Sequence, residues 1–128
     1  MRVYVTKAFA RFARKERLDN GRLCEAIRRA GQGAVDADLG GNLIKQRVAR
    51  QGGGRSGGYR TVIAYRASQR SVFLYGFAKN ERDDIDDKEL NDLKKLSKQL
   101  LNYTEEQMAT AMMQSELREV KCDDQEEE

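Results

Sequence analysis

The first thirty residues place short apolar runs beside stretches with helical spacing. Residues 3–5 form an apolar run that predicts a strand. Over residues 7–17, apolar side chains recur at three- and four-residue intervals, which predicts an amphipathic helix. A second helix is expected to start at a cap formed by Asp19 or Asn20 and to end near Ala30, before two glycines.

The middle of the chain changes to the two-residue alternation of strands. After an irregular link that contains Gly40 and Gly41, three runs have this character: residues 43–50, 59–65 and 71–77. In the first run Lys45 and Arg47 share one face, opposite the apolar residues. The third run is apolar on both faces, which suits the central strand of a sheet covered by helices on one side. A glycine-rich segment and a short turn join the runs, so neighbouring strands are expected to be antiparallel.

The last third of the chain predicts two further helices. One starts near Asp86 or Asp87, and a stripe of leucines forms its buried face. The other starts at Thr104, whose pairing with Gln107 has the form of a capping box. We therefore predict an α+β fold, in which a small antiparallel β-sheet packs against N-terminal and C-terminal helices.

The length of 128 residues suits one compact domain. We expect the main domain over residues 1–101, a helical extension over 102–122 packed on the same domain, and a disordered acidic tail over 123–128. Cys24 and Cys122 lie far apart in the sequence and match no metal-ligand spacing. Because the N-terminus lacks the apolar run of a signal peptide, we expect a cytoplasmic protein with reduced thiols.

The composition removes several kinds of chemistry. The chain contains no histidine, which excludes Ser-His-Asp and Cys-His catalysis and zinc held by histidine. Any reaction would have to use lysine, arginine, tyrosine, acidic side chains or cysteine. We expect no metal, no cofactor and no association with a membrane.

The net charge of +3 conceals a strong segregation of charge along the chain. Residues 1–82 contain 18 basic and 6 acidic side chains, a net charge of +12, whereas residues 83–128 have a net charge of −9. Residues 43–82 alone contain nine basic residues and one acid, Glu81. This distribution indicates a polyanionic partner for the basic part of the chain.

The glycine-rich segment 52–58 does not match a nucleotide-binding loop. It lacks the Gly-Lys-Ser/Thr ending and leads into a strand, so no helix N-terminus follows to bind a phosphate. The segment is either a flexible hairpin tip or a loop whose Arg55 contacts phosphate. Arg60 follows it at the start of a strand, where Lys45, Arg47 or Arg50 can lie opposite.

Two short motifs carry a resemblance to a known family. The run Arg55-Ser56-Gly57-Gly58-Tyr59-Arg60 enters one apolar strand, and Phe77-Ala78-Lys79-Asn80-Glu81 leaves the next. In this order and spacing they resemble the RelE/ParE superfamily of type II toxins, and most closely its HigB-like branch. The resemblance covers residues 39–101, and the N-terminal strand and helices agree with it in layout.

This resemblance implies a toxin that cleaves mRNA on the ribosome and is held inactive by a cognate antitoxin. The implied reaction is metal-independent attack of a ribose 2′-hydroxyl on the adjacent phosphate. It needs positive charge to balance the phosphorane and a proton for the leaving oxygen, which arginine and lysine can supply. The implied catalytic residues are Arg60, Lys79, Lys45 and Arg47, and the further candidates for RNA binding are Arg50, Arg55, Arg66 and Arg82.

Two other functions are compatible with the same residues. ParE-type relatives share the fold but inhibit DNA gyrase without cleaving RNA. A basic surface is also sufficient for a regulator that binds nucleic acid and has no enzymatic activity. The positions of Arg60 and Lys79 favour the nuclease over the gyrase inhibitor.

Overall fold

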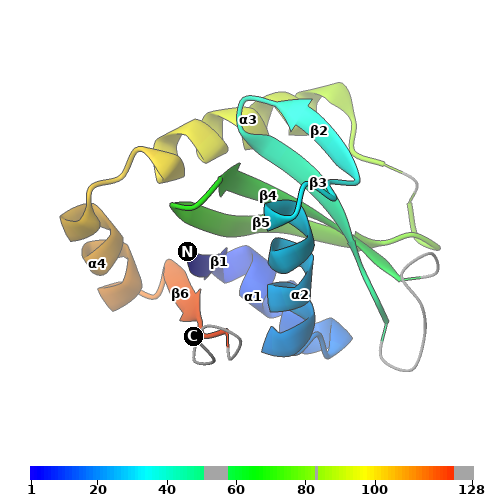
Figure 1. Cartoon of the computed structure of the whole chain (residues 1–128), viewed down its shortest axis with the longest axis horizontal. Helices are drawn as coiled ribbons and strands as arrows, with labels where there is room; N and C mark the ends of the chain where they lie inside the picture. The colour runs from blue at the N-terminus through cyan, green and yellow to red at the C-terminus, as the bar shows by residue number, and fades with distance from the viewer. Residues whose placement is uncertain (51–57, 83, 123–128) are drawn as a thin grey trace.

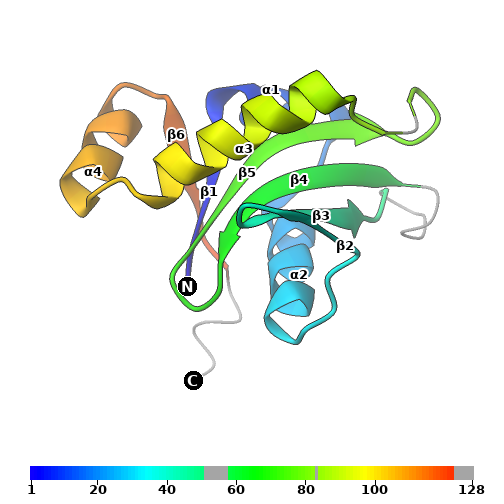
Figure 2. The same ribbon diagram turned by 90° about the horizontal axis from the view of Figure 1, so that it is seen from above.

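The computed structural model describes residues 1–50, 58–82 and 84–122. Within these ranges, a six-stranded sheet has helices on both faces (Figures 1 and 2). The strands are β1 (Arg2–Thr6), β2 (Ala37–Gly40), β3 (Leu43–Val48), β4 (Tyr59–Arg66), β5 (Arg70–Ala78) and β6 (Leu117–Val120). The helices are α1 (Lys7–Glu16), α2 (Asn20–Gly31), α3 (Asp87–Leu101) and α4 (Glu105–Met113). The predicted α+β class is confirmed.

The sheet is mainly antiparallel, with strand order β2-β3-β4-β5-β1-β6. Strands β2 to β5 form an antiparallel series, and β6 pairs antiparallel with β1. The pairing of β1 with β5 is parallel. This parallel pairing arises because α1 and α2 follow β1 in the chain, and the antiparallel series β2 to β5 then ends with β5 beside β1.

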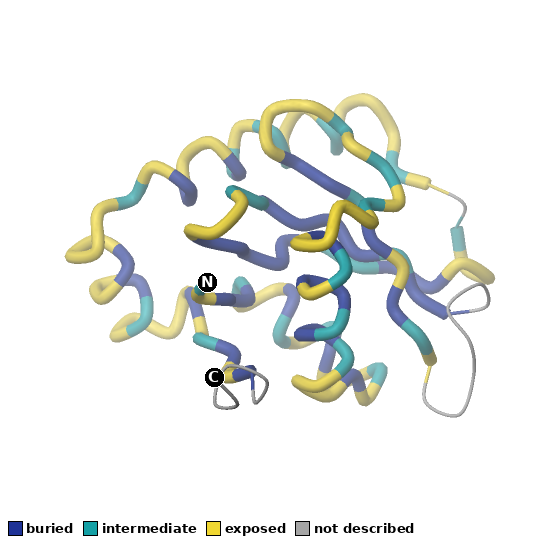
Figure 3. The backbone as a smooth tube through the Cα atoms, viewed as in Figure 1, coloured by how far each residue is buried: buried dark blue, intermediate teal, exposed yellow. Residues whose placement is uncertain are grey.

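Two apolar clusters pack on opposite faces of the sheet. Phe9 of α1 and Leu23 of α2 belong to the cluster on one face, with Phe73 of β5. Leu100 of α3 and Met108 of α4 belong to the cluster on the other face. Figure 3 shows buried residues along the central strands and exposed residues on the outer sides of the helices. The α1–α2 face and the α3 face are named below by these helices.

Three helices begin at the caps that the sequence predicts. The side chain of Asp19 accepts a hydrogen bond from the Arg22 amide at the start of α2. Asp86 forms a capping box with Glu89 at the start of α3, and Thr104 forms one with Gln107 at the start of α4. These caps satisfy backbone N–H groups that have no partner within the helix.

The pattern did not predict the two outer strands of the sheet. β2 occupies part of the link that was expected to be irregular, and β6 lies within the expected helical extension. Each has four residues, too few for alternation to be diagnostic, and each forms against a neighbour that is already a strand. The tail 123–128 and most of the glycine-rich segment lie outside the described residues.

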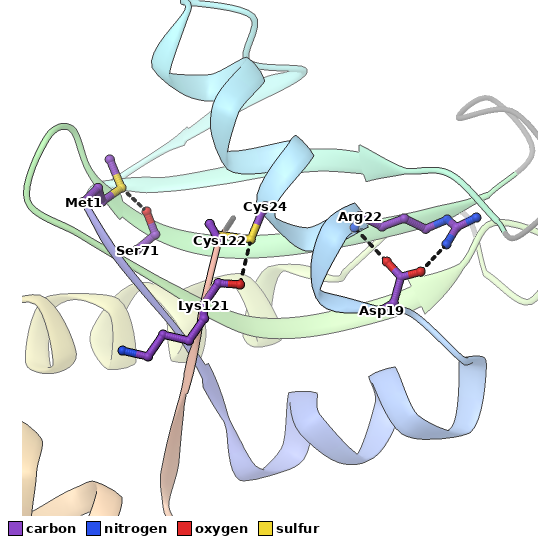
Figure 4. Close-up of a disulfide and its surroundings, with 7 residues drawn as sticks. All are labelled: Met1, Asp19, Arg22, Cys24, Ser71, Lys121 and Cys122. Atoms are coloured by element: carbon purple, nitrogen blue, oxygen red, sulfur yellow. Dashed lines mark hydrogen bonds and ion pairs between the residues drawn. A yellow bond between two sulfur atoms is a disulfide. The ribbon is translucent and has the colours of Figure 1, made fainter. Parts of the chain in front are cut away.

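The expectation of reduced thiols is wrong in this structure. Cys24 of α2 and Cys122, which follows β6, are joined by a disulfide with a Cα–Cα distance of 5.7 Å (Figure 4). Both residues are buried in the cluster beneath α1 and α2. The two cysteines are 98 residues apart in the sequence. They meet because β6 brings Cys122 to the face of the sheet on which α2 packs. No local sequence pattern predicts this arrangement.

Candidate functional site

Two arginines from neighbouring strands lie directly opposite each other on the α3 face. Arg47 of β3 pairs in register with Arg60 of β4. The next pair along the strands, Val48 and Tyr59, belongs to the cluster on the α1–α2 face, so alternation places both arginines on the α3 face. Directly opposed side chains have Cβ atoms about 5 Å apart, and like charges at this spacing repel. An anion between them would remove this repulsion.

Arg60 is the least satisfied of the basic side chains on this face. Its Nη1 atom is buried and has no hydrogen-bond partner among the described residues. A buried polar group without a partner costs about 1–3 kcal/mol, and a charged group costs more. Because Nη1 is closed to solvent, an anion with acceptor oxygens can compensate it only after the side chain moves, and the residue as a whole is partly exposed.

Two aromatic rings of β5 lie on this face near Arg60: Phe77, which is buried, and Tyr75, which is partly exposed. Phe77 lies opposite Arg60 in the β4–β5 pairing. The Cζ atom of Arg82 lies 5.6 Å from the centroid of the Phe77 ring and 6.0 Å from that of Tyr75. Arg82 also donates a hydrogen bond of 2.9 Å to the Tyr75 hydroxyl. Tyr75 shares the face of Phe77 two positions earlier in β5, within a run that the sequence indicates only as an apolar strand.

The N-terminus of α3 fixes Arg82 in place. Both oxygens of the Glu89 carboxylate accept hydrogen bonds from Arg82, at 2.6 and 3.0 Å. These bonds raise the pKa of the Arg82 guanidinium and lower the pKa of Glu89. Because Glu89 is also a member of the capping box, the start of α3 and the position of Arg82 are coupled. The seven residues that separate Arg82 from Glu89 in the sequence do not indicate that the two side chains form an ion pair.

Lys45 is held by an acidic residue in the connection between β5 and α3. Its Nζ lies 3.1 Å from both carboxylate oxygens of Asp84. Burial alone would raise the pKa of Asp84, but hydrogen bonds from the Ile85 amide and from Lys45 outweigh it and lower the pKa. Lys45 is thus paired with Asp84, which precedes α3, and Arg82 is paired with Glu89, which lies in the first turn of α3.

Lys79 lies at the open end of the same region. It follows β5 directly, is exposed, and its amide donates a hydrogen bond to the carbonyl of Gly58, which precedes β4. Across the described ranges, the side chains of Lys79, Arg47 and Arg60 form no ion pair. The structure therefore brings together three unpaired cations beside the two that acids hold.

The remaining predicted residues lie elsewhere. Arg50 stacks over the ring of Tyr59, with its Cζ 5.2 Å from the centroid, on the α1–α2 face. Arg66 lies about 20 Å from Arg60 along β4. It donates hydrogen bonds to the carbonyl of Leu101 and to Asn102 at the end of α3. Arg55 lies outside the described residues.

Two tyrosines of β4 that could have served as bases face away from Arg60. The Tyr59 hydroxyl donates a hydrogen bond to Glu16. Burial is the largest cause of the raised pKa of the Tyr59 hydroxyl, and this hydrogen bond is the second. Burial also raises the pKa of Tyr65, whose hydroxyl lies near α2. Neither position nor pKa suits these groups to accept a proton from a molecule bound at Arg60.

A small α+β protein with two directly opposed arginines that form no ion pair with any described residue has the features of a protein that binds a polyanion. The model of a protein family described as the RelE toxin of the RelE/RelB toxin-antitoxin system matches residues 1–120. The chain therefore belongs to the RelE toxin family, which confirms the resemblance of its motifs to the RelE/ParE superfamily, while the HigB-like branch stays a prediction. Comparisons with curated proteins and with solved structures found no match.

No helix in the described part of the chain has the length and apolar character needed to cross a bilayer. Within residues 1–50, 58–82 and 84–122, no group of three or more cysteine or acidic side chains could hold a metal ion.

Proposed function

We propose that this RelE-family toxin is an mRNA endonuclease that acts on messages occupied by ribosomes in the cytoplasm. The observation that carries the proposal is the buried, unpartnered Nη1 of Arg60, directly across from Arg47. Such a pair can bind a phosphate through fork-shaped guanidinium groups, which match the geometry of its oxygens. The partly exposed ring of Tyr75 adds a surface suited to stacking with a base.

The proposed reaction is transesterification within the RNA chain. The 2′-hydroxyl loses its proton to solvent as its oxygen bonds to the adjacent phosphorus, the bond from that phosphorus to the 5′-oxygen of the next nucleotide breaks, and a 2′,3′-cyclic phosphate remains. Arg60 and Arg47 would balance the extra negative charge of the phosphorane. Lys79, unpaired at the open end of the site, would give a proton to the leaving oxygen. Lys45 and Arg82, each paired with an acid, would bind and orient the RNA.

The decisive experiment maps cleavage sites by primer extension on translated and untranslated copies of one mRNA. We expect cuts at codon-associated positions only when ribosomes occupy the message, because the ribosome positions the reacting groups. Equal cleavage of naked RNA would indicate a general ribonuclease. Absence of cleavage together with loss of supercoiling by DNA gyrase would instead identify a gyrase inhibitor.

A second expectation concerns the antitoxin. We expect an acidic or apolar segment of the antitoxin to cover the face that contains Arg47 and Arg60, because these unpaired cations attract an acidic partner. The double variant Arg47→Glu/Arg60→Glu should weaken the complex and reduce its dependence on salt. Titration calorimetry at two ionic strengths measures both effects. Deletion of residues 123–128 is the control and should leave affinity unchanged; the reverse result would place the interface at the C-terminus.

A further inference from the structure

The backbone of Arg47 is held from the outer side of β3 by two side chains that belong to neither β2 nor β3. The Arg47 amide donates a hydrogen bond of 2.7 Å to the carboxylate of Asp36, which precedes β2. The Arg47 carbonyl accepts a hydrogen bond from the guanidinium of Arg29 in α2. Asp36 and Arg29 also form an ion pair at 3.5 Å. We call these two side chains the Arg47 clamp.

The Arg47 clamp takes the place of a neighbouring strand. In an antiparallel ladder the amide and the carbonyl of one residue point to the same side. Because both groups of Arg47 point to the clamp, Arg47 and Arg60 are a pair without mutual backbone hydrogen bonds, the kind whose side chains lie closer together. β2 pairs with β3 only as far as Lys45. Among the described strands, therefore, none holds the backbone of Arg47 on its outer side.

A buried glutamine fixes the Arg47 clamp relative to the sheet. Figure 2 shows α2 beside β3, with a short link from α2 to β2. The side chain of Gln46 in β3 is buried, and its Oε1 accepts a hydrogen bond of 2.7 Å from the Asp36 amide. Its Nε2 donates to the carbonyl of Ala26 in α2 at 2.9 Å and to that of Ala34 in the link at 3.2 Å. Because satisfied buried networks are rigid, Asp36 has a fixed position beside Arg47.

The Arg47 clamp leaves the Arg47 guanidinium available to an anion. The bonds that Asp36 and Arg29 make to Arg47 go to its backbone. The Arg47 side chain is exposed and forms no ion pair with a described residue. The Arg29 side chain is 13% exposed and pairs with Glu25 at 3.0 Å as well as with Asp36, so acids compensate its own charge. The acid beside Arg47 thus holds its position without neutralising its side chain.

We propose that Asp36 is a positioning residue for Arg47, and that Arg29 assists it. Directly opposed like charges repel, and a strand edge without a neighbour can yield to this repulsion. The Arg47 clamp keeps Arg47 opposite Arg60 before the phosphate arrives, so that both guanidinium groups are preorganised for the charge of the phosphorane. The inference rests on the proposed function for the role of Arg47.

The test is a double-mutant cycle in single-turnover cleavage of translated mRNA by the full-length protein. Asp36→Ala is measured in the wild-type background and in the Arg47→Ala background. In the wild-type background we expect a rate about tenfold to a hundredfold lower, because a displacement of about 1 Å can cost about a hundredfold. In the Arg47→Ala background the same substitution should change the rate by less than about twofold, because its effect passes through Arg47.

Two further variants separate positioning from charge and from folding. Asp36→Asn keeps an oxygen that can accept the Arg47 amide, and should cleave at nearly the wild-type rate. Asp38→Ala is the matched control: it removes an acid that accepts a hydrogen bond of 2.9 Å from the Gly40 amide in β2. This control should also keep the wild-type rate. Urea denaturation shows whether Asp36→Ala is folded under the assay conditions.

Three results would overturn the inference. Equal slowing by Asp36→Ala in both backgrounds would mean that Asp36 supports the fold and not Arg47 in particular. Equal slowing by Asp36→Asn and Asp36→Ala would assign the effect to the charge of the carboxylate. Equal slowing by Asp38→Ala would show that any acid in this region has the same effect.

Two other readouts distinguish a failure of this inference from a failure of the proposed function. If the wild-type protein inhibits growth without cleaving translated mRNA, the nuclease function fails, and the same cycle measured in growth inhibition judges Asp36. Amide hydrogen exchange of Arg47 tests the Arg47 clamp without any activity. Exchange should be faster in Asp36→Ala than in the wild type or Asp36→Asn. Equal exchange in all three would overturn the inference whatever the protein cleaves.

Discussion

Arg60→Ala is expected to slow mRNA cleavage about a hundredfold to a thousandfold, the usual cost of removing one donor that stabilises transition-state charge. The free energy of unfolding should not fall, because the buried Nη1 atom has no partner in the described part of the fold and its removal breaks no hydrogen bond. Growth inhibition and single-turnover cleavage on ribosomes measure the first effect. Urea denaturation measures the second.

Arg66→Ala is the matched control for this prediction. It removes the same side chain from the same face of β4, but Arg66 holds the carbonyl of Leu101 at the end of α3. We expect this variant to be destabilised by about 1.5–3 kcal/mol, as for a lost hydrogen bond to a charged group, and to cleave at nearly the wild-type rate. If Arg60→Ala instead loses stability and retains activity, Arg60 belongs to the framework of the fold.

Removal of the disulfide is expected to lower the free energy of unfolding by about 4–5 kcal/mol. The bond closes a loop with a sequence separation of 98, and long loops restrict the unfolded chain most. The double variant Cys24→Ala/Cys122→Ala should show this loss in chemical denaturation. Wild-type protein treated with a dithiol reductant should show the same midpoint as the variant.

The reductant itself provides the control for the disulfide. The double variant has no bond to reduce, so its denaturation curve should be identical with and without the dithiol. Cleavage by the folded variant should be close to normal, because both cysteines lie in the cluster on the face opposite to Arg60. A wild-type curve that does not respond to the reductant would mean that the two thiols are not joined in solution.

Local signals in the sequence account for much of this fold. The caps at Asp19, Asp86 and Thr104 were predictable because a helix start is determined by a few consecutive residues. Alternation placed Lys45 and Arg47 on one face because the strand repeat is two residues.

The same two-residue repeat also indicates which face of the sheet Arg50 lies on. Arg50 is two residues beyond Val48, so extending the alternation places it on the α1–α2 face, where it stacks on Tyr59. The residue type, rather than its position in the strand, led to its inclusion among the candidates for RNA binding.

Contacts between distant segments could not be predicted in the same way. The ion pair of Arg82 with Glu89 depends on the path between β5 and α3. The partner of Arg60 was narrowed to three residues, but choosing Arg47 among them required the register of β3 with β4. The strand β6 and the disulfide both depend on the antiparallel pairing of β6 with β1, two segments that are far apart in the sequence.

The pairing of β1 with β6 has a consequence for how the sheet forms. β6 is the sixth described strand in chain order and pairs with the first, so this contact has the longest sequence separation of any strand pair described. Contacts between segments this far apart form slowly, because the chain between them must first be closed into a long loop. Until β6 pairs, one edge of β1 keeps backbone N–H and C=O groups without strand partners, so a toxin molecule that has not completed its sheet is open to pairing with another chain along this edge.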